Sequence, residues 1–224
     1  YSSKLAKKSI FKNLKLLITY SILHNLLYNL SRMYKLILLL FSIPLIIFSE
    51  PKEGQDYTII PEGLIKLDGV TEIFWYGCPA CFAYEEILEK ISTERPDAQI
   101  NKIPLFTEPT AKTYYAIELL QLGNAAHLRV FEDWQLKRRQ FKTENDIRSF
   151  ARRHGYDEEG LAKAFNSFSV QIKARNAINL PRRMIDSGID FSGTPTTVVN
   201  GKYLVTRQRD NQKEIEIILY LLDK

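Results

Sequence analysis

Apolar side chains recur along this chain with two different periods, one typical of strands and one typical of helices. Residues 70–76 are mostly β-branched or aromatic and stop at Gly77, which predicts a buried strand. An apolar stripe with helical spacing then follows at Cys81, Tyr84, Leu88 and Ile91. Residues 57–60 and 98–105 are two further β-prone runs. The pattern therefore predicts a leader strand and then a β–α–β unit whose two strands are parallel.

The periodicity becomes helical over residues 108–188. Five helices are predicted there, over residues 110–122, 125–138, 143–155, 157–165 and 169–178. Thr110 is expected to cap the first of these helices and Gly123 to end it. Thr143 to Asp146 resembles a capping box, with Asp in the place of the usual Glu or Gln. Pro181 is expected to kink or end the last helix.

Strand-like alternation returns near the C-terminus. Residues 196–199 and 202–205 flank Asn200-Gly201, which supplies the positive φ angles of a type I′ turn, so we predict a β-hairpin. Asp210 or Asn211 can cap a final helix. The apolar stripe of that helix lies at Ile215, Ile218, Leu219 and Leu222. The order of elements indicates two α/β halves separated by a helical insertion.

The only two cysteines of the chain lie between the first core strand and its helix, in Gly77-Cys78-Pro79-Ala80-Cys81. Pro79 suits the first helical position, which places Cys78 at the N-cap, beside unpaired N–H groups and the positive end of the helix dipole. Both effects favour a thiolate over a thiol. Cys81, one turn further, is expected to be more buried. One cysteine can then attack or leave while the other closes the disulfide.

Three plainer interpretations of this pair stay open: a structural disulfide, half of a zinc site, or two core cysteines. Zinc needs four ligands, and the histidines of the chain, His24, His127 and His154, do not lie near the motif. A strand, a closely spaced cysteine pair and a helix in this order favour redox chemistry.

The N-terminal part differs in composition from the rest. Met33 is the first methionine, and a basic start is followed by an apolar run from Leu36 to Phe48. Such a run is typical of a secretory signal and is short for a membrane span. We therefore expect residues 1–32 to be upstream sequence or an extension, and residues 33–49 to be a signal peptide. An uncleaved membrane anchor is the alternative.

Charge changes at the same boundary. The chain has a net charge of +5, yet residues 1–49 contain 7 of its 31 Lys and Arg residues and none of its 26 Asp and Glu residues. The remainder carries 24 basic and 26 acidic residues. A nucleic-acid-binding domain is usually basic, so no nucleic-acid partner is expected.

The order strand, strand–Cys-x-x-Cys–helix, strand, helical insertion, proline, hairpin and helix resembles the DsbA family of bacterial periplasmic thiol–disulfide oxidoreductases. The resemblance extends from about Tyr57 to the C-terminus, and its most specific blocks are residues 72–81, 166–168, 193–195 and 199–203. It implies an α/β thioredoxin fold made of residues 57–107 and 189–224. Residues 108–188 would form an inserted all-helical domain.

The resemblance also implies roles for single residues. Cys78 would be the solvent-facing reactive cysteine and Cys81 the resolving one. Thr194-Pro195 would be a cis-proline dipeptide packed against them, with the Thr194 backbone aimed at an extended substrate that pairs like an added strand. Two more positions would contact substrate beside the reactive sulfur, Pro79 and Ala80.

Glu72 is the one charge in a predicted strand that is otherwise apolar except for Thr71. It is either a strand start close to solvent or a buried carboxylate of raised pKa that exchanges protons with Cys81. Lys102, in the neighbouring strand, matches the family lysine that accompanies this acid, or it is a snorkelling surface lysine. Glu72 and Lys102 are therefore candidate catalytic residues.

Two departures from the family pattern bear on the direction of the reaction. The best-known members have histidine in the place of Ala80, so this chain is expected to hold its thiolate less strongly and to be a weaker oxidant than they are. Threonine before the cis-proline, here Thr194, is more typical of isomerase and reductase relatives. We expect a dithiol oxidase that introduces disulfide bonds into exported proteins. The alternatives are an isomerase or reductase that is kept reduced, and a non-catalytic secreted chaperone or binding module.

The resemblance finally implies the surroundings of the protein. Expected partners are unfolded exported proteins with free cysteines, and a DsbB-like membrane quinone reductase that reoxidises the enzyme. No metal or organic cofactor is expected besides the redox-active disulfide Cys78–Cys81. The lack of an obvious dimerisation segment favours a monomer. The expected location is the periplasm of a Gram-negative bacterium, with a membrane-anchored form that faces the periplasm as the alternative.

Overall fold

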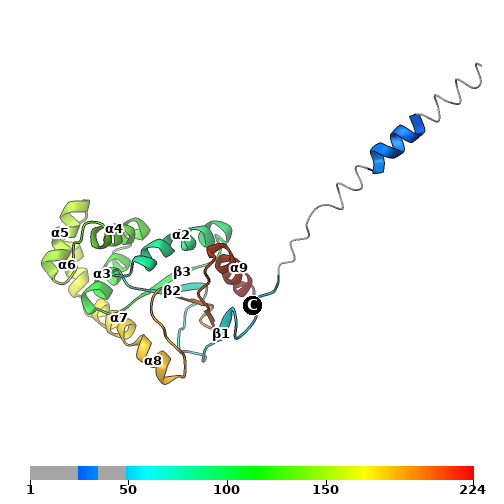
Figure 1. Cartoon of the computed structure of the whole chain (residues 1–224). Helices are drawn as coiled ribbons and strands as arrows, with labels where there is room; N and C mark the ends of the chain where they lie inside the picture. Colours follow the sequence, from blue (N-terminus) through cyan, green and yellow to red (C-terminus); the bar gives the residue numbers. More distant parts are fainter. Residues whose placement is uncertain (1–24, 35–48) are drawn as a thin grey trace, which may run out of the picture. The chain divides into compact units, whose positions relative to one another are not determined.

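The computed structural model of the protein describes residues 25–34 and 49–224 (Figure 1). The chain falls into two units, Tyr1–Ser49 and Glu50–Lys224. In the first unit, residues 25–34 form a helix whose side chains are exposed. Most of the predicted signal peptide at 33–49, and most of the segment at 1–32, lie outside the described residues. None of the helices in the described ranges combines the length and the apolar character that crossing a membrane requires.

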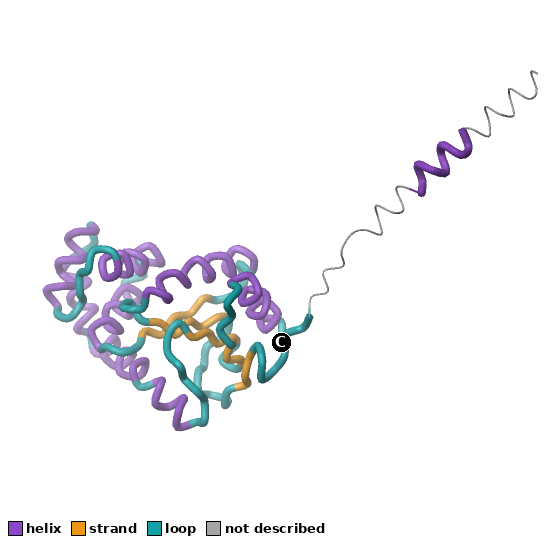
Figure 2. The backbone as a smooth tube through the Cα atoms, viewed as in Figure 1, coloured by secondary structure: helices purple, strands orange, loops and turns teal. Residues whose placement is uncertain are grey.

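The second unit is built on one five-stranded sheet, shown in orange in Figure 2. Its strands are β1 (Tyr57–Ile59), β2 (Val70–Phe74), β3 (Ile100–Pro104), β4 (Thr196–Val199) and β5 (Tyr203–Val205). The spatial order is β1-β5-β4-β2-β3. β2 and β3 are parallel and the other neighbours are antiparallel. The predicted leader strand, β–α–β unit and C-terminal hairpin are thus all present.

Eight helices accompany this sheet in the second unit. They are α2 (Pro79–Glu94), α3 (Glu108–Leu119), α4 (Gly123–Gln135), α5 (Glu144–His154), α6 (Glu158–Asn166), α7 (Phe168–Ile178), α8 (Leu180–Asp186) and α9 (Asn211–Leu222). Helices α3 to α8 all lie between β3 and β4 in the chain, whereas α2 joins β2 to β3 and α9 follows the hairpin (Figure 1). This arrangement is a thioredoxin fold with a helical insertion.

Three apolar clusters hold the unit together. On one face of the sheet, α2 and α9 pack against Val70 and Val199. On the other face, α8 packs through Leu180 and Met184 against Ile73 and neighbouring side chains. The third cluster is the core of the inserted helices, and it also takes in Phe74, Tyr76 and Cys81 from the end of β2 and the start of α2. The cysteine pair therefore lies at the seam between the sheet and the insertion.

Several predicted boundaries of the insertion are wrong. α3 begins at Glu108, two residues before Thr110, which lies in its first turn and donates a hydrogen bond to the Thr107 carbonyl. Gly123 does not end that helix: it has a φ of 75° and is the first residue of α4. The helix before Pro181 does end at Ile178, as predicted, but Pro181 then lies in the first turn of a further short helix, α8, which the periodicity did not predict. Proline fits this place because the first turn of a helix has N–H groups without helical partners.

The strand at the cysteine motif is also shorter than predicted. β2 ends at Phe74, and Trp75 and Tyr76 leave the ladder before the helix begins. Tyr76 turns into the core of the inserted helices, where its ring packs edge-on against Phe131 at 4.8 Å between centroids. Packing in the tertiary structure thus outweighs the β-propensity of these two aromatic residues.

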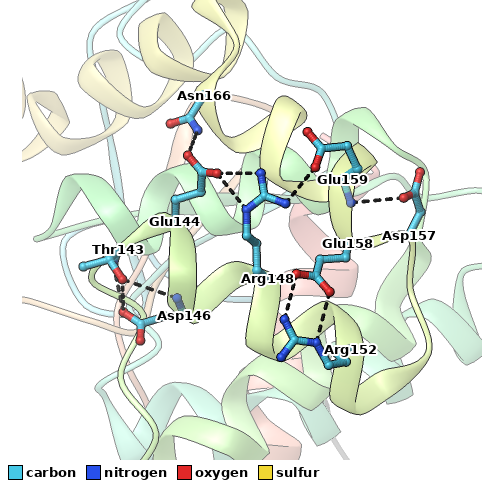
Figure 3. Close-up of polar contacts among 9 residues, drawn as sticks. All are labelled: Thr143, Glu144, Asp146, Arg148, Arg152, Asp157, Glu158, Glu159 and Asn166. Atoms are coloured by element: carbon cyan, nitrogen blue, oxygen red, sulfur yellow. Dashed lines mark hydrogen bonds and ion pairs between the residues drawn. The ribbon is translucent and has the colours of Figure 1, made fainter.

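Other local predictions of the insertion are confirmed. Thr143 and Asp146 form a reciprocal capping box at the start of α5, and Gly155 ends that helix in the left-handed region. Surface ion pairs then join α5 to α6 (Figure 3). Arg148 contacts both Glu144 and Glu159. Exposed pairs of this kind contribute at most about 1 kcal/mol each, so the apolar core provides most of the stability of this helix pair.

Candidate active site

The reactive end of the motif is the N-terminus of α2. Cys78 is the N-cap residue, with extended backbone angles, and its Sγ accepts a hydrogen bond from the Cys81 backbone N–H at 3.3 Å. Pro79 lies in the first turn, as predicted. Both cysteines are unpaired thiols. Cys78 is half-buried and Cys81 is fully buried. The predicted difference in burial is confirmed, and the Cys78 sulfur lies at the start of the helix, where it accepts the Cys81 N–H group.

The loop that presents Cys78 is fixed from two sides. Gly77 leaves no room for a side chain, because a Cβ atom there would lie 2.3 Å from the ring of Trp75. Gln135, at the end of α4, donates a hydrogen bond from Nε2 to the Tyr76 carbonyl at 2.6 Å. The inserted helices therefore help to hold the motif loop in place.

A proline loop faces the motif from the other half of the fold. The Thr194–Pro195 peptide bond is cis, as the resemblance implies. The thiol of Cys78 donates a hydrogen bond to the Thr194 carbonyl at 3.3 Å, across more than a hundred residues of sequence. Pro79 and Ala80 are exposed at the helix tip beside this contact. The residues that the sequence nominated for substrate contact thus share one surface with the Cys78 sulfur.

Beneath this surface, Glu72 and Lys102 meet inside the protein. They are register partners across β2 and β3, and Lys102 Nζ lies 3.1 Å from Glu72 Oε2. Glu72 is 0% exposed and the Lys102 side chain is 8% exposed. The interpretations of Glu72 as a strand start near solvent and of Lys102 as a snorkelling surface residue are therefore wrong. Among the described residues, Glu72 Oε1 has no hydrogen-bond partner.

Burial dominates the acid–base properties of this site. It raises the pKa of Glu72 to about 7, against the opposing effect of the Lys102 ammonium. Burial also raises the pKa of the Cys81 thiol, and the charge of Glu72 raises it further. Burial alone would lower the pKa of Lys102, but the carboxylates of Glu72 and Glu85 outweigh it and the pKa is raised. Lys102 therefore stays an ammonium while Glu72 can exchange a proton near neutral pH.

Two buried residues of this site were missed from the sequence. Glu85 accepts from Lys102 Nζ at 2.6 Å, and His127 Nε2 lies 3.0 Å from the same Glu85 oxygen. Glu85 had a local signal, since it follows Cys81 by four residues on the buried side of α2. His127 had none: although remote from the motif in sequence, it approaches it in space through α4. His127 thus contacts Tyr76 and Glu85, which lie on either side of the cysteine motif in the sequence.

Fold and site together define a class of protein. A cysteine pair at a helix N-terminus, with the second sulfur buried, a cis-proline loop against the first and an acid beneath, is the arrangement of a thioredoxin-fold thiol–disulfide oxidoreductase.

Comparison with known proteins agrees with this class, and the similar proteins described here are all DsbA proteins. The thiol:disulfide interchange protein DsbA of Pseudomonas syringae pv. tomato is 28% identical over 188 residues, which cover 79% of this chain and 86% of that protein. The crystal structure of DsbA from Xylella fastidiosa has a TM-score of 0.65 at 26% identity and covers 78% of this chain and 97% of its own. A DsbA variant from Proteus mirabilis, solved with a non-covalently bound peptide, has a TM-score of 0.64 at 19% identity and covers 79% and 100%. No model of a protein family matches the chain. These comparisons support a thiol:disulfide oxidoreductase similar to the DsbA proteins over most of the chain.

Proposed function

We propose that this protein is a dithiol oxidase for exported polypeptides, and that Cys78 is the sulfur that exchanges with substrate. One observation carries the proposal. The half-buried Cys78 sulfur accepts a helix N–H group and contacts the cis-proline loop, while Cys81 is sealed beneath it. This asymmetry supports substrate attack at Cys78 and departure of Cys81.

The proposed reaction begins with the Cys78–Cys81 disulfide. A substrate thiolate attacks Cys78 Sγ, the disulfide bond breaks, and Cys81 leaves with the electron pair. Because burial makes a Cys81 thiolate unfavourable, it takes up a proton, for which Glu72 is the proposed donor. A second substrate thiolate then attacks the substrate sulfur of the mixed disulfide and expels Cys78 as a thiolate. The substrate loses two electrons and the enzyme gains them.

The proline loop is the proposed substrate guide. Thr194 and Pro195 precede β4, and an extended peptide laid beside them can pair with the loop backbone as an added strand. The peptide bound to the Proteus DsbA supports a peptide substrate for this chain as well. Pro79 and Ala80, exposed at the helix tip, would contact the substrate next to its reacting cysteine.

We further propose that a DsbB-like membrane quinone reductase reoxidises the cysteine pair, that the protein acts in the periplasm, and that it works as a monomer. The family supports each of these assignments. The reaction as written draws its two electrons through the cysteines alone, so it calls for no metal or organic cofactor.

The direction of the reaction can be tested in cells by trapping the thiols with an alkylating reagent. A largely oxidised Cys78–Cys81 pool is expected. Thr194 before the cis-proline favours the second candidate, an isomerase or reductase, and a largely reduced pool would establish that function in place of the oxidase. A Cys78→Ala variant with full activity in cells would instead point to a binding module.

Replacement of Ala80 with histidine is expected to make the enzyme a stronger oxidant. A cationic imidazole at the helix tip would stabilise the Cys78 thiolate, and each tenfold gain corresponds to about 30 mV for a two-electron couple. The reduction potential against glutathione should therefore rise by about 30 mV or more in Ala80→His. Ala83→His is the matched control, because Ala83 is exposed on the same helix beyond Cys81. An equal rise in both variants, or none in Ala80→His, would contradict the argument.

A further inference from the structure

A chain of buried hydrogen bonds runs from the inserted helices to the sheet. It starts at the Tyr76 hydroxyl, which lies 2.7 Å from His127 Nδ1. His127 Nε2 lies 3.0 Å from Glu85 Oε1, and Lys102 Nζ bridges that oxygen at 2.6 Å to Glu72 Oε2 at 3.1 Å. His127 is 2% exposed and belongs to α4, whereas Glu85, Lys102 and Glu72 belong to α2, β3 and β2. His127 of the insertion is thus linked, through Glu85 and Lys102, to Glu72, the acid proposed to serve Cys81.

The hydrogens of this chain have one consistent assignment. Burial lowers the pKa of His127 to about 4, so its ring is neutral at pH 7. Burial would raise the pKa of Glu85, but the hydrogen bond from His127 and the charge of Lys102 outweigh it, and the pKa is lowered. An ionised carboxylate only accepts hydrogen bonds, so His127 Nε2 carries the hydrogen and donates it to Glu85. Nδ1 then accepts from the Tyr76 hydroxyl.

The imidazole is held in place by aromatic rings. Phe74, Tyr114 and Phe131 meet it edge-on, with centroid distances of 5.1, 5.5 and 5.1 Å. Such contacts fix both the place and the plane of the ring. The donor that His127 offers to Glu85 is therefore oriented before any reaction begins.

We propose that His127 is a positioning residue for the redox reaction: it fixes Glu85, which shares Lys102 with Glu72, and so sets how readily Glu72 exchanges a proton with Cys81. This inference rests on the proposed function, in which Glu72 serves Cys81. Glu85 Oε1 now has two donors, His127 and Lys102. Without His127, the Lys102 ammonium is drawn more strongly to Glu85 and stabilises the Glu72 carboxylate less. Glu72 should then stay protonated to a higher pH.

Lys102 joins Glu85 to Glu72, and these three residues are called the bridge below. The bridge also borders a cavity. A cavity of about 770 Å³ is lined by Glu85, Lys102 and His127, among others, and Cys78 is not in its wall. This cavity offers Glu85 and Lys102 a place to exchange protons with solvent, and Pro79, one of the proposed substrate contacts, also lines it.

Further titratable groups surround the bridge and share in its electrostatics. They are Cys81 and Tyr84 on α2, Tyr76 after β2, and Tyr114 and Glu118 on α3. Burial raises the pKa of Tyr76, Tyr84 and Tyr114, so these three remain neutral through the pH range of interest. Among Glu72, Glu85, Lys102 and His127, the charge that responds to pH near neutrality is therefore that of Glu72.

The test is the pH profile of ring closure in the full protein. Cys78 is first converted to a mixed disulfide with glutathione, and the rate at which Cys81 displaces glutathione is followed by stopped-flow tryptophan fluorescence. In the wild type the rate should rise with pH through an inflection near that of Glu72, about 7. In His127→Leu the inflection should move up by about half a pH unit or more. In His127→Gln, whose amide N–H can replace the Nε2 donor, it should return towards the wild-type value.

The matched control is His154→Leu. His154 lies in the same insertion and pairs with a buried carboxylate, Asp133, at 3.2 Å, but it has no contact with the bridge. Its profile should match the wild type. If His127→Leu does not fold, His127→Asn replaces it, because the shorter amide does not reach Glu85.

Two different results would show whether the role of His127 or the proposed function of Glu72 is at fault. A profile of His127→Leu or His127→Asn that stays at the wild-type position, moves to lower pH, or moves no further than that of His154→Leu overturns the role of His127. A wild-type inflection near pH 7 that survives in Glu72→Gln overturns the proposed function of Glu72 instead, whatever His127 does.

Discussion

Replacement of Cys78 with serine is expected to abolish disulfide transfer, with a loss of roughly a thousand-fold or more. A serine hydroxyl cannot form a disulfide with Cys81. It also cannot form the mixed disulfide with substrate from which the Cys78 thiolate leaves, so both halves of the exchange are lost. The measurement is the rate at which the oxidised protein converts a reduced, unfolded substrate to its disulfide form. Circular dichroism establishes that the variant is folded.

Cys81→Ser is the informative partner of this variant. Cys78 then keeps its place at the helix tip, but no second sulfur can release a bound substrate. On reaction with a disulfide-containing peptide, covalent mixed disulfides should accumulate in Cys81→Ser and be absent in Cys78→Ser. The reverse pattern, with complexes trapped through Cys81, would mean that the order of the two sulfurs has been assigned the wrong way round.

Replacement of Glu72 with glutamine is expected to make the protein more stable at high pH. Burial disfavours the charged form, so the pKa of this carboxyl is about 7 in the folded protein, against 4.5 for an unperturbed glutamate. The stability that the protonated Glu72 gives is therefore fully present below pH 4.5 and is lost as the pH rises through about 7. At pH 8 the wild type should be less stable than Glu72→Gln by up to about 3 kcal/mol, relative to their difference at pH 4.5.

Urea unfolding of the reduced proteins at a series of pH values measures this difference. Glu86→Gln serves as the control, because Glu86 is exposed on α2 and its replacement should leave the pH dependence of the wild type unchanged. A difference between wild type and Glu72→Gln that stays constant from pH 4.5 to 8, or that favours the wild type at high pH, would show that Glu72 is not a destabilised buried acid.

Local chemistry explains why much of the fold could be predicted. Asn200 and Gly201 both adopt the positive φ angles that a tight hairpin requires. Asp210 caps α9 through its side chain, and Thr143 with Asp146 caps α5. Each of these features depends on residues a few positions apart, so the sequence contains the whole interaction. The same holds for Cys78 at the N-cap of α2.

Features that depend on distant residues were predicted less well. Gly123 carries the positive φ expected of a helix stop, but the chain turns at once into α4. Tyr76 leaves the strand for a core built from helices that follow it in the chain. His127 is the clearest case, since its partners Tyr76 and Glu85 lie 51 and 42 residues away. No periodicity or spacing could have brought these three side chains together.

The same contrast applies to the candidate site. The cysteine motif was found from its place between a strand and a helix, and Glu72 from its charge in an apolar strand. The cis-proline loop and Lys102 were found because the family resemblance supplied positions to examine. The structure then decided between alternatives that the sequence left open, since Glu72 and Lys102 proved to be buried and paired. Glu85 and His127 belonged to no recognised motif and so drew no attention, although they complete the hydrogen-bond network that reaches Glu72 through Lys102.

The reduction potential of the Cys78–Cys81 pair, measured against glutathione, is the most direct test of an oxidase whose leaving group is a stabilised thiolate. We expect a value between that of the strongly oxidising DsbA, about −120 mV, and that of thioredoxin, about −270 mV, because Ala80 supplies no cation at the helix tip. A potential at or below that of thioredoxin would contradict the account, since the reduced pair would then reduce the disulfide bonds of substrates instead of forming them.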